Sequence, residues 1–125
     1  MVNDELTKRV IGAAFQVHNT LGSGFLEAVY ERALSIELNK LGIPHERQAP
    51  LKVTYDGHIV GEFAADILIE GELVVELKAV AKLATVHEVQ LVNYLAATGI
   101  NIGLLINFGP DKVDVKRKYR TYTAH

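Results

Sequence analysis

Three charged residues lie where two predicted strands should run side by side. Glu76 and Lys78 are two residues apart in an otherwise apolar run, so their side chains share one face of a strand. Asp66 lies ten residues before Glu76, on the preceding predicted strand, and a short turn near Glu70 and Gly71 would bring the two carboxylates together. Buried strands mostly avoid charge, so this cluster needs a reason. Two carboxylates at one point repel each other unless a cation neutralises them.

Oxygen ligands of this kind suit hard divalent cations. The chain has no cysteine, which excludes thiolate metal sites, so Asp66 and Glu76 would hold Mg²⁺ or Mn²⁺. Lys78 beside them could orient or help to deprotonate a metal-bound water. The alternative is that Glu76 and Lys78 lie on a solvent face and pair across strands, an arrangement worth about 0.2–1 kcal/mol.

Two predicted helices contribute further polar groups. Gln90 and Tyr94 are four residues apart and therefore lie on one face of a helix. Glu27 and Tyr30, three residues apart, form a similar pair in the first turns of an earlier helix. Glu27 could instead serve only to stabilise the N-terminus of that helix.

The spacing of apolar residues predicts the elements that would position these groups. Two helices come first, one over about residues 5–19 and one that is capped by Ser23 or Gly24 and runs to about Lys40. The pattern then changes to period two and predicts three antiparallel strands, over about 49–55, 58–69 and 72–78. Asp56-Gly57 between the first two strands is a strong hairpin signal.

The second half of the chain predicts a crossover connection. A helix is expected over 85–98, followed by a strand over 101–108 whose apolar residues indicate burial on both faces. A last short strand is expected over 113–119. The order ααβββαββ therefore predicts an α/β domain with a mixed β-sheet flanked by helices.

The composition limits the class of protein. With 125 residues, of which 49% are hydrophobic, the chain suits one globular domain with one core, so we expect a single domain over 1–125. No run approaches 18 uncharged apolar residues, and the N-terminus lacks the features of a signal peptide. We therefore expect a cytoplasmic protein without a membrane partner.

Charge is distributed unevenly along the chain. The net charge of −2 argues against a generally basic surface for nucleic acid. Residues 1–111 carry 8 Lys and Arg against 14 Asp and Glu, whereas the tail 112–125 carries 5 against 1. The tail could meet a phosphate backbone and stack Tyr119 and Tyr122 on bases. A solvated strand end explains the same residues equally well.

The charged cluster resembles a known signature. Asp66 followed by Glu76-Leu77-Lys78 is similar to the signature of the PD-(D/E)XK nuclease superfamily, with Ala65 in place of its proline. The resemblance implies a restriction-endonuclease-like fold.

Three further segments match in the right order. The segment 90–94, QLVNY, matches the QxxxY motif of lambda-exonuclease-like members. The segment 24–30, GFLEAVY, fits the motif that names the small GxxExxY proteins, and 104–109, LLINFG, resembles their late strand. The resemblance covers essentially the whole chain, from about residue 11 to residue 108.

The resemblance also implies a divalent-metal site. Asp66 and Glu76 would be the ligating carboxylates, with the backbone carbonyl of Leu77 as a third ligand. Glu27 would correspond to the first-helix acid that many members use as a further metal contact. The cofactor would be Mg²⁺ or Mn²⁺.

The implied chemistry is hydrolysis of phosphodiester bonds in nucleic acid, with DNA as the expected substrate. Lys78 would act on the nucleophilic water. Gln90 and Tyr94 would position the scissile strand or support the site, and Tyr30 would join them in binding substrate.

Two hypotheses from different classes follow. The first is an active metal-dependent nuclease, which the intact constellation favours. The second is a catalytically silent module of the same fold that binds nucleic acid or a protein partner, because the chain is close to a bare core and its main body is acidic. A homodimer would let so small a domain bind and cut both strands of a duplex.

Overall fold

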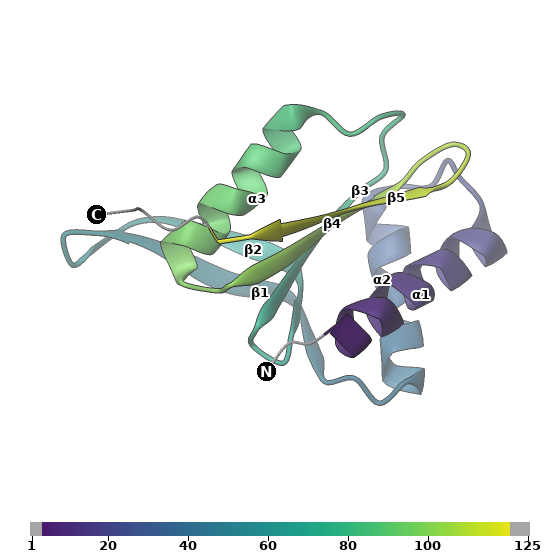
Figure 1. Ribbon diagram of the computed structural model, residues 1–125, viewed down its shortest axis with the longest axis horizontal. Coiled ribbons are helices and arrows are strands. Elements are labelled where there is room, and N and C mark those ends of the chain that lie inside the picture. Colours follow the sequence, from purple (N-terminus) through teal and green to yellow (C-terminus); the bar gives the residue numbers. More distant parts are fainter. Residues whose placement is uncertain (1–3, 121–125) are drawn as a thin grey trace.

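A single five-stranded sheet organises the computed structural model, which describes residues 4–120 (Figure 1). The strands lie side by side in chain order, from β1 to β5. The predicted order ααβββαββ and the mixed sheet are confirmed. The elements are α1 (Asp4–Leu21), α2 (Glu27–Lys40), β1 (His45–Tyr55), β2 (His58–Ile69), β3 (Leu73–Lys78), α3 (Thr85–Thr98), β4 (Ile102–Phe108) and β5 (Val113–Tyr119).

The pairing of the strands follows from their connections. β1, β2 and β3 are antiparallel to one another, as expected of the predicted meander. β3 and β4 are parallel, because α3 returns the chain to the end of the sheet where β3 began. β5 is antiparallel to β4. The carboxyl ends of β3 and β4 therefore meet at one end of the sheet, with Lys78 beside Asn107.

Helices cover both faces of the sheet. α1 and α2 pack on one face and α3 packs on the other (Figure 1). β3 and β4 are apolar almost throughout because both of their faces are buried. The α1–α2 cluster, the larger of the two cores, includes Val10, Val17, Leu34, Ile67, Val75, Leu77 and Ile106. The α3 cluster contains Ala49, Ala65, Val74, Leu91, Leu95 and Leu105.

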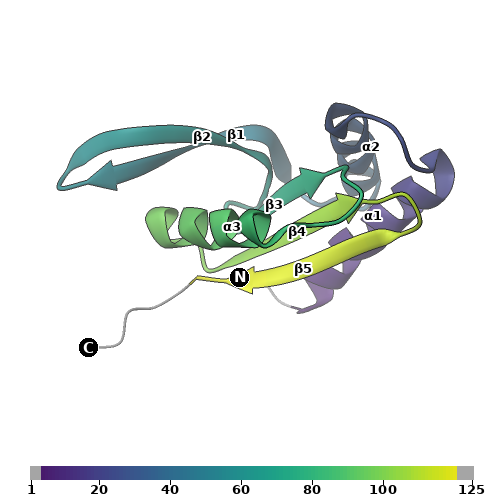
Figure 2. The same ribbon diagram turned by 90° about the horizontal axis from the view of Figure 1, so that it is seen from above.

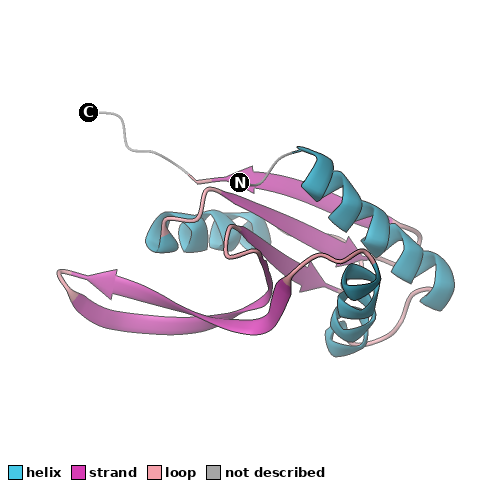
Figure 3. Cartoon of the chain, turned by 90° about the horizontal axis from the view of Figure 1, so that it is seen from below, coloured by secondary structure: helices cyan, strands magenta, loops and turns pink. Residues whose placement is uncertain are grey.

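β1 and β2 form a long hairpin that extends beyond the other strands (Figures 2 and 3). Asp56 and Gly57 form its turn with φ values of 51° and 77°, as a type I′ turn requires, so the predicted hairpin is confirmed. β2 pairs with β3 only from Ile67 to Ile69. Asp66 therefore lies at the point where the hairpin leaves the rest of the sheet.

Two predicted boundaries are wrong. β1 begins at His45 rather than near residue 49, because the polar residues at its start pair with β2 but hide the period-two pattern. α2 begins at Glu27, with Leu26 as its N-cap and no side-chain cap. Ser23 and Gly24 belong to the preceding loop; Gly24 has a φ of 98°, whereas an N-cap has the extended conformation that Leu26 adopts.

Candidate active site

The predicted carboxylates meet where β2 diverges from β3. The backbone N–H of Leu77 donates to Asp66 Oδ2 at 2.8 Å, where a continuous β2–β3 ladder would have offered a backbone acceptor. Leu77 lies between Glu76 and Lys78, so this bond holds Asp66 against the Glu-Leu-Lys segment. The β2–β3 register, in which Ile67 pairs with Val75, brings Asp66 beside Glu76, and the Asp66 carboxyl raises the pKa of Glu76.

Glu76 and Lys78 point toward the α3 face of the sheet. They alternate with Val75 and Leu77, which belong to the α1–α2 cluster, and they share the face of Val74 in the α3 cluster. Both charged side chains are partly buried. Glu76 and Lys78 are therefore not an exposed ion pair on a solvent face, the alternative that the sequence left open.

The Glu76 carboxyl lies where a negative charge is unfavourable. Its pKa is raised from 4.5 to about 8, first by burial, then by the charge of Asp66 and by a side-chain hydrogen bond with Asp66. The Lys78 ammonium lowers this pKa, and the Glu27 carboxyl raises it. Glu76 Oε1 is buried, and it has no hydrogen-bond partner among the described residues. An unpaired buried oxygen costs free energy. A cation at this oxygen would supply the missing partner, so the donor set fits a divalent metal.

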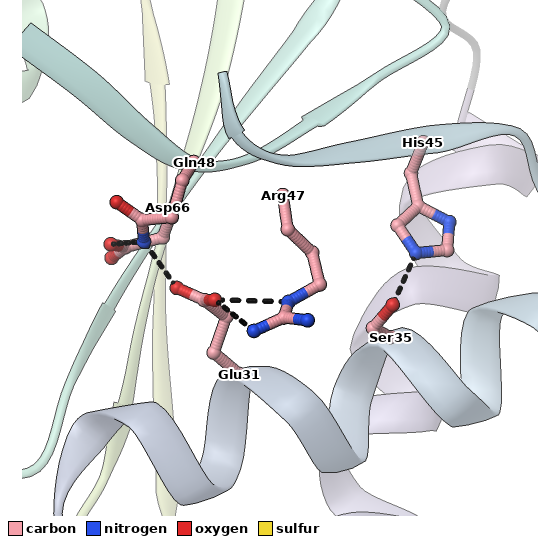
Figure 4. A network of polar contacts seen from close by, with 6 residues as sticks. All are labelled: Glu31, Ser35, His45, Arg47, Gln48 and Asp66. Carbon is pink, nitrogen blue, oxygen red and sulfur yellow. Dashed lines mark hydrogen bonds and ion pairs between the residues drawn. The ribbon is translucent and has the colours of Figure 1, made fainter. Parts of the chain in front are cut away.

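A polar network behind Asp66 connects it to α2 (Figure 4). Gln48 Nε2 donates to Asp66 Oδ1 at 3.3 Å and also to Glu31 Oε1. Arg47 Nε and Nη2 both bind Glu31 Oε2 at 3.0 Å. Glu31 is only 6% exposed, so Arg47 compensates a buried charge. Neither Glu31 nor Gln48 was predicted; the one available signal is that Glu31 lies one helical turn after Glu27.

Gln90 and Tyr94 are brought together on α3, as their spacing predicted. Gln90 Nε2 donates to the Tyr94 hydroxyl at 2.8 Å. The Tyr94 ring stacks on Phe63 of β2, with 3.7 Å between the ring centroids. Phe63 is three residues before Asp66, so the stack connects α3 to the hairpin close to the carboxylates. The Gln90 side chain is exposed, whereas that of Tyr94 is partly buried.

Tyr30 lies in the core, where the prediction of a substrate contact finds no support. Its side chain is 0% exposed, and its ring stacks on Phe108 with 4.4 Å between centroids. Its hydroxyl donates to the Gly22 carbonyl at 2.7 Å and accepts from the Phe25 N–H at 3.3 Å. Tyr30 therefore fastens the loop between α1 and α2 to the core.

The carboxylate pair, the following lysine and the mixed sheet occur together in a known group of enzymes. The sequence profile of the PD-(D/E)XK nuclease superfamily matches residues 4–118. The chain belongs to this superfamily.

A solved structure supports the same fold. The crystal structure of SSO0001 resembles this chain with a TM-score of 0.61 and 18% sequence identity. The likeness covers 77% of this chain and 50% of SSO0001, so this chain corresponds to half the length of that protein. The fold is thus restriction-endonuclease-like. No curated protein matches significantly. Among the described helices, none has the length and apolar character needed to cross a membrane.

Nucleases of the PD-(D/E)XK superfamily generally use divalent metals, and this chain offers a sparse set of ligands. Within residues 4–120, no three His, Asp or Glu side chains form a metal-binding group. Asp66 and Glu76 supply two carboxylates. Glu27 is exposed in the first turn of α2. Its charge raises the pKa of Glu76, but it does not form a group of three ligands with Asp66 and Glu76. A cation here would also need oxygens from the backbone or from water.

Asn107 fixes the end of β3 in this nuclease fold. It is fully buried and pairs in register with Lys78. Its Oδ1 accepts from the Val80 N–H and its Nδ2 donates to the Val80 carbonyl, both at 2.9 Å. The chain that follows Lys78 is therefore held at a fixed place. An isolated amide at the end of an apolar strand was the signal for this role.

The basic tail is partly used within the domain. Arg117 on β5 binds Asp4 and Thr7 of α1, and Lys118 binds Glu88 of α3 at 2.6 Å, which lowers the pKa of Glu88. Lys116 remains exposed. Tyr122, a predicted base-stacking residue, lies outside the described residues. Structural anchoring thus accounts for Arg117 and Lys118.

Proposed function

We propose that this chain is a divalent-metal-dependent nuclease that hydrolyses phosphodiester bonds in DNA. Glu76 carries the proposal, because its buried carboxyl has an unpartnered oxygen and a raised pKa beside Asp66 and Lys78. In a cluster that served stability alone, we would expect such a carboxyl to be fully paired, or an apolar residue to occupy its position. We also assign the chain to the GxxExxY group of the superfamily, on the match of the segment 24–30.

Mg²⁺ or Mn²⁺ would be held by Asp66, Glu76 and the backbone carbonyl of Leu77. Glu27 would be a more distant contact through water. When bound, the cation lowers the pKa of water and neutralises charge that develops on the phosphate. The hydrogen bond from Leu77 N–H to Asp66 ties two of these ligands to each other, which favours a defined geometry.

Lys78 would hold the attacking water and stabilise negative charge on the phosphate. It shares the strand face of Glu76, and its charge already acts on that carboxyl. Gln90 would contact the substrate strand through its exposed amide, which Tyr94 orients. Tyr30 receives no role in substrate binding because it is buried.

The test is cleavage of single-stranded DNA, duplex DNA and RNA in Mg²⁺, in Mn²⁺ and in chelator. We expect DNA cleavage that requires the metal, and we expect Lys78→Ala to reduce its rate by about 10²- to 10⁴-fold. Lys82→Ala is the matched control, because Lys82 is an exposed lysine in the loop just after β3. That variant should cleave at the wild-type rate.

Two outcomes would count against the enzyme. Equal cleavage by wild type and Lys78→Ala would indicate a contaminating nuclease. No cleavage by either would favour the catalytically silent module, and fluorescence anisotropy with the same nucleic acids would then measure whether the protein binds them.

A further inference from the structure

Gln48 has a backbone conformation that is uncommon for its residue type. Its φ is 51°, in the left-handed region, although it lies within β1. Its neighbours Arg47 and Ala49 both pair with β2, but Gln48 does not. The ladder is thus interrupted at the level of Asp66. Such a conformation is energetically unfavourable and persists only where the surrounding structure enforces it.

The interruption changes which face of the sheet each strand presents. Ala65 belongs to the α3 cluster, whereas Ile67, two residues later, belongs to the α1–α2 cluster. Residues two apart in a regular strand share a face. On β1, Ala49 likewise joins the α3 cluster while Arg47 contacts α2 through Glu31. The hairpin therefore changes sides at Gln48 and Asp66.

The side chain of Gln48 lies between two carboxylates (Figure 4). Its amide nitrogen has two hydrogens and donates to both Asp66 Oδ1 and Glu31 Oε1. Asp66 is consequently held at both oxygens, since Leu77 N–H binds Oδ2 at 2.8 Å. A carboxylate oxygen has two lone pairs, so these bonds leave Asp66 able to ligate a cation. A neutral donor also joins the acids without adding charge.

We propose that Gln48 is a positioning residue for the metal site. It holds Asp66 in the orientation that faces Glu76 and Leu77, and Glu31, fixed by Arg47, holds Gln48 in turn. This inference rests on the proposed function, because it treats Asp66 as a metal ligand. The strained backbone then has a physical reason, since it directs the Gln48 amide toward Asp66.

The experiment combines amide hydrogen exchange with Mn²⁺ binding in Gln48→Met and Gln48→Gly. Gln48→Met keeps the length of the side chain and the strained backbone but removes the donor, whereas Gln48→Gly also relieves the strain. In metal-free protein we expect the Leu77 amide to exchange about tenfold faster in both variants. Val75, within the β2–β3 ladder, should exchange as in wild type. The Kd for Mn²⁺ should rise about 10- to 100-fold in both.

Two further variants separate positioning from general stability. Glu70→Gly relieves a similar φ of 52° in the exposed turn before β3, and it should alter neither Leu77 exchange nor Mn²⁺ affinity. Gln48→Asn keeps an amide and tolerates the left-handed region, so it should recover part of both properties. In chelator, Gln48→Gly should have a higher melting temperature than Gln48→Met.

The results distinguish this inference from the proposed function. Unchanged Leu77 exchange in Gln48→Met would overturn the positioning role. Faster Leu77 exchange, together with no Mn²⁺ binding by wild type, would support the hold of Gln48 on Asp66 and overturn the metal site instead.

Discussion

Two acidic side chains are withdrawn from water in neighbouring parts of this molecule, and their surroundings differ sharply. Glu31 on α2 is 6% exposed, and Arg47 binds one of its oxygens while Gln48 binds the other. Glu76 on β3 has a raised pKa of about 8, and its Oε1 has no partner among the described residues. Both oxygens of the Glu31 carboxyl are paired, whereas one oxygen of the Glu76 carboxyl is not.

The difference shows that burial of an acid is not by itself a sign of function. A paired, hydrogen-bonded carboxylate such as Glu31 is adequately explained as part of the fold. A carboxyl with an unpartnered buried oxygen, such as Glu76, weakens the fold, and costs of this kind are retained mainly at functional sites. Gln48 connects the two regions, since it binds both Glu31 and Asp66. The paired acid Glu31 thus supports Asp66, the neighbour of Glu76, through Gln48.

Among the substitutions, removing the compensation from Glu31 should cause the largest loss of stability. Arg47→Ala leaves the Glu31 carboxylate buried with only the Gln48 amide as partner. Breaking a buried ion pair costs about 3–5 kcal/mol; because Arg47 is 40% exposed, water moderates this, and we expect a loss of about 2 kcal/mol. Denaturant unfolding in chelator measures it.

An exposed ion pair provides the control for Arg47→Ala. Lys40 binds Glu37 at 2.9 Å but is 68% exposed, so Lys40→Ala should cost less than about 0.5 kcal/mol. Equal losses in the two variants would mean that the burial of Glu31 has no energetic consequence, and the contrast with Glu76 would fail.

Glu76 should make the metal-free protein less stable as pH rises. Its pKa in the folded state, about 8, is above the ordinary value of 4.5, so the folded state binds this proton more tightly than the unfolded state does. The resulting stabilisation is complete below pH 4.5 and is lost as the pH rises through about 8. The loss is at most about 1.4 kcal/mol per pH unit. Unfolding in chelator between pH 5 and pH 8 measures it.

Glu76→Gln identifies the group responsible for this slope. Glutamine cannot ionise, so the variant should show a flatter pH dependence and should exceed wild type in stability at pH 8. A variant that kept the wild-type slope would assign the pH dependence to another group. Mn²⁺ should raise the stability of wild type most at high pH, because binding requires the ionised carboxylate.

The sequence predicted the sheet and the carboxylate pair because both depend on short-range regularities. Alternation and a two-residue turn define the hairpin, and ten residues across a tight turn bring Asp66 to Glu76. The Gln48 contacts could not be predicted in this way. They depend on a left-handed residue that is not glycine, and on an interrupted ladder, and neither leaves a periodic signal.

Tyr30 shows a different limit of sequence reasoning. Its place three residues after Glu27 suggested a shared face beside the substrate. The same spacing also fits a helix in which Glu27 is exposed and Tyr30 points into the core. Only the packing of Tyr30 against Phe108 decides between these two arrangements. A motif can therefore contain residues that build the site without touching its ligand.

A smaller effect tests this interpretation of Tyr30. Tyr30→Phe keeps the ring stacked on Phe108 but removes the hydroxyl that binds Gly22 and Phe25. We expect a loss of about 1 kcal/mol in unfolding free energy, because two hydrogen bonds disappear but water can reach the groups of the loop that they leave. Mn²⁺ affinity and cleavage rate should remain at wild-type values. A large loss of cleavage at unchanged stability would return Tyr30 to the substrate contacts and would require the loop between α1 and α2 to open during binding.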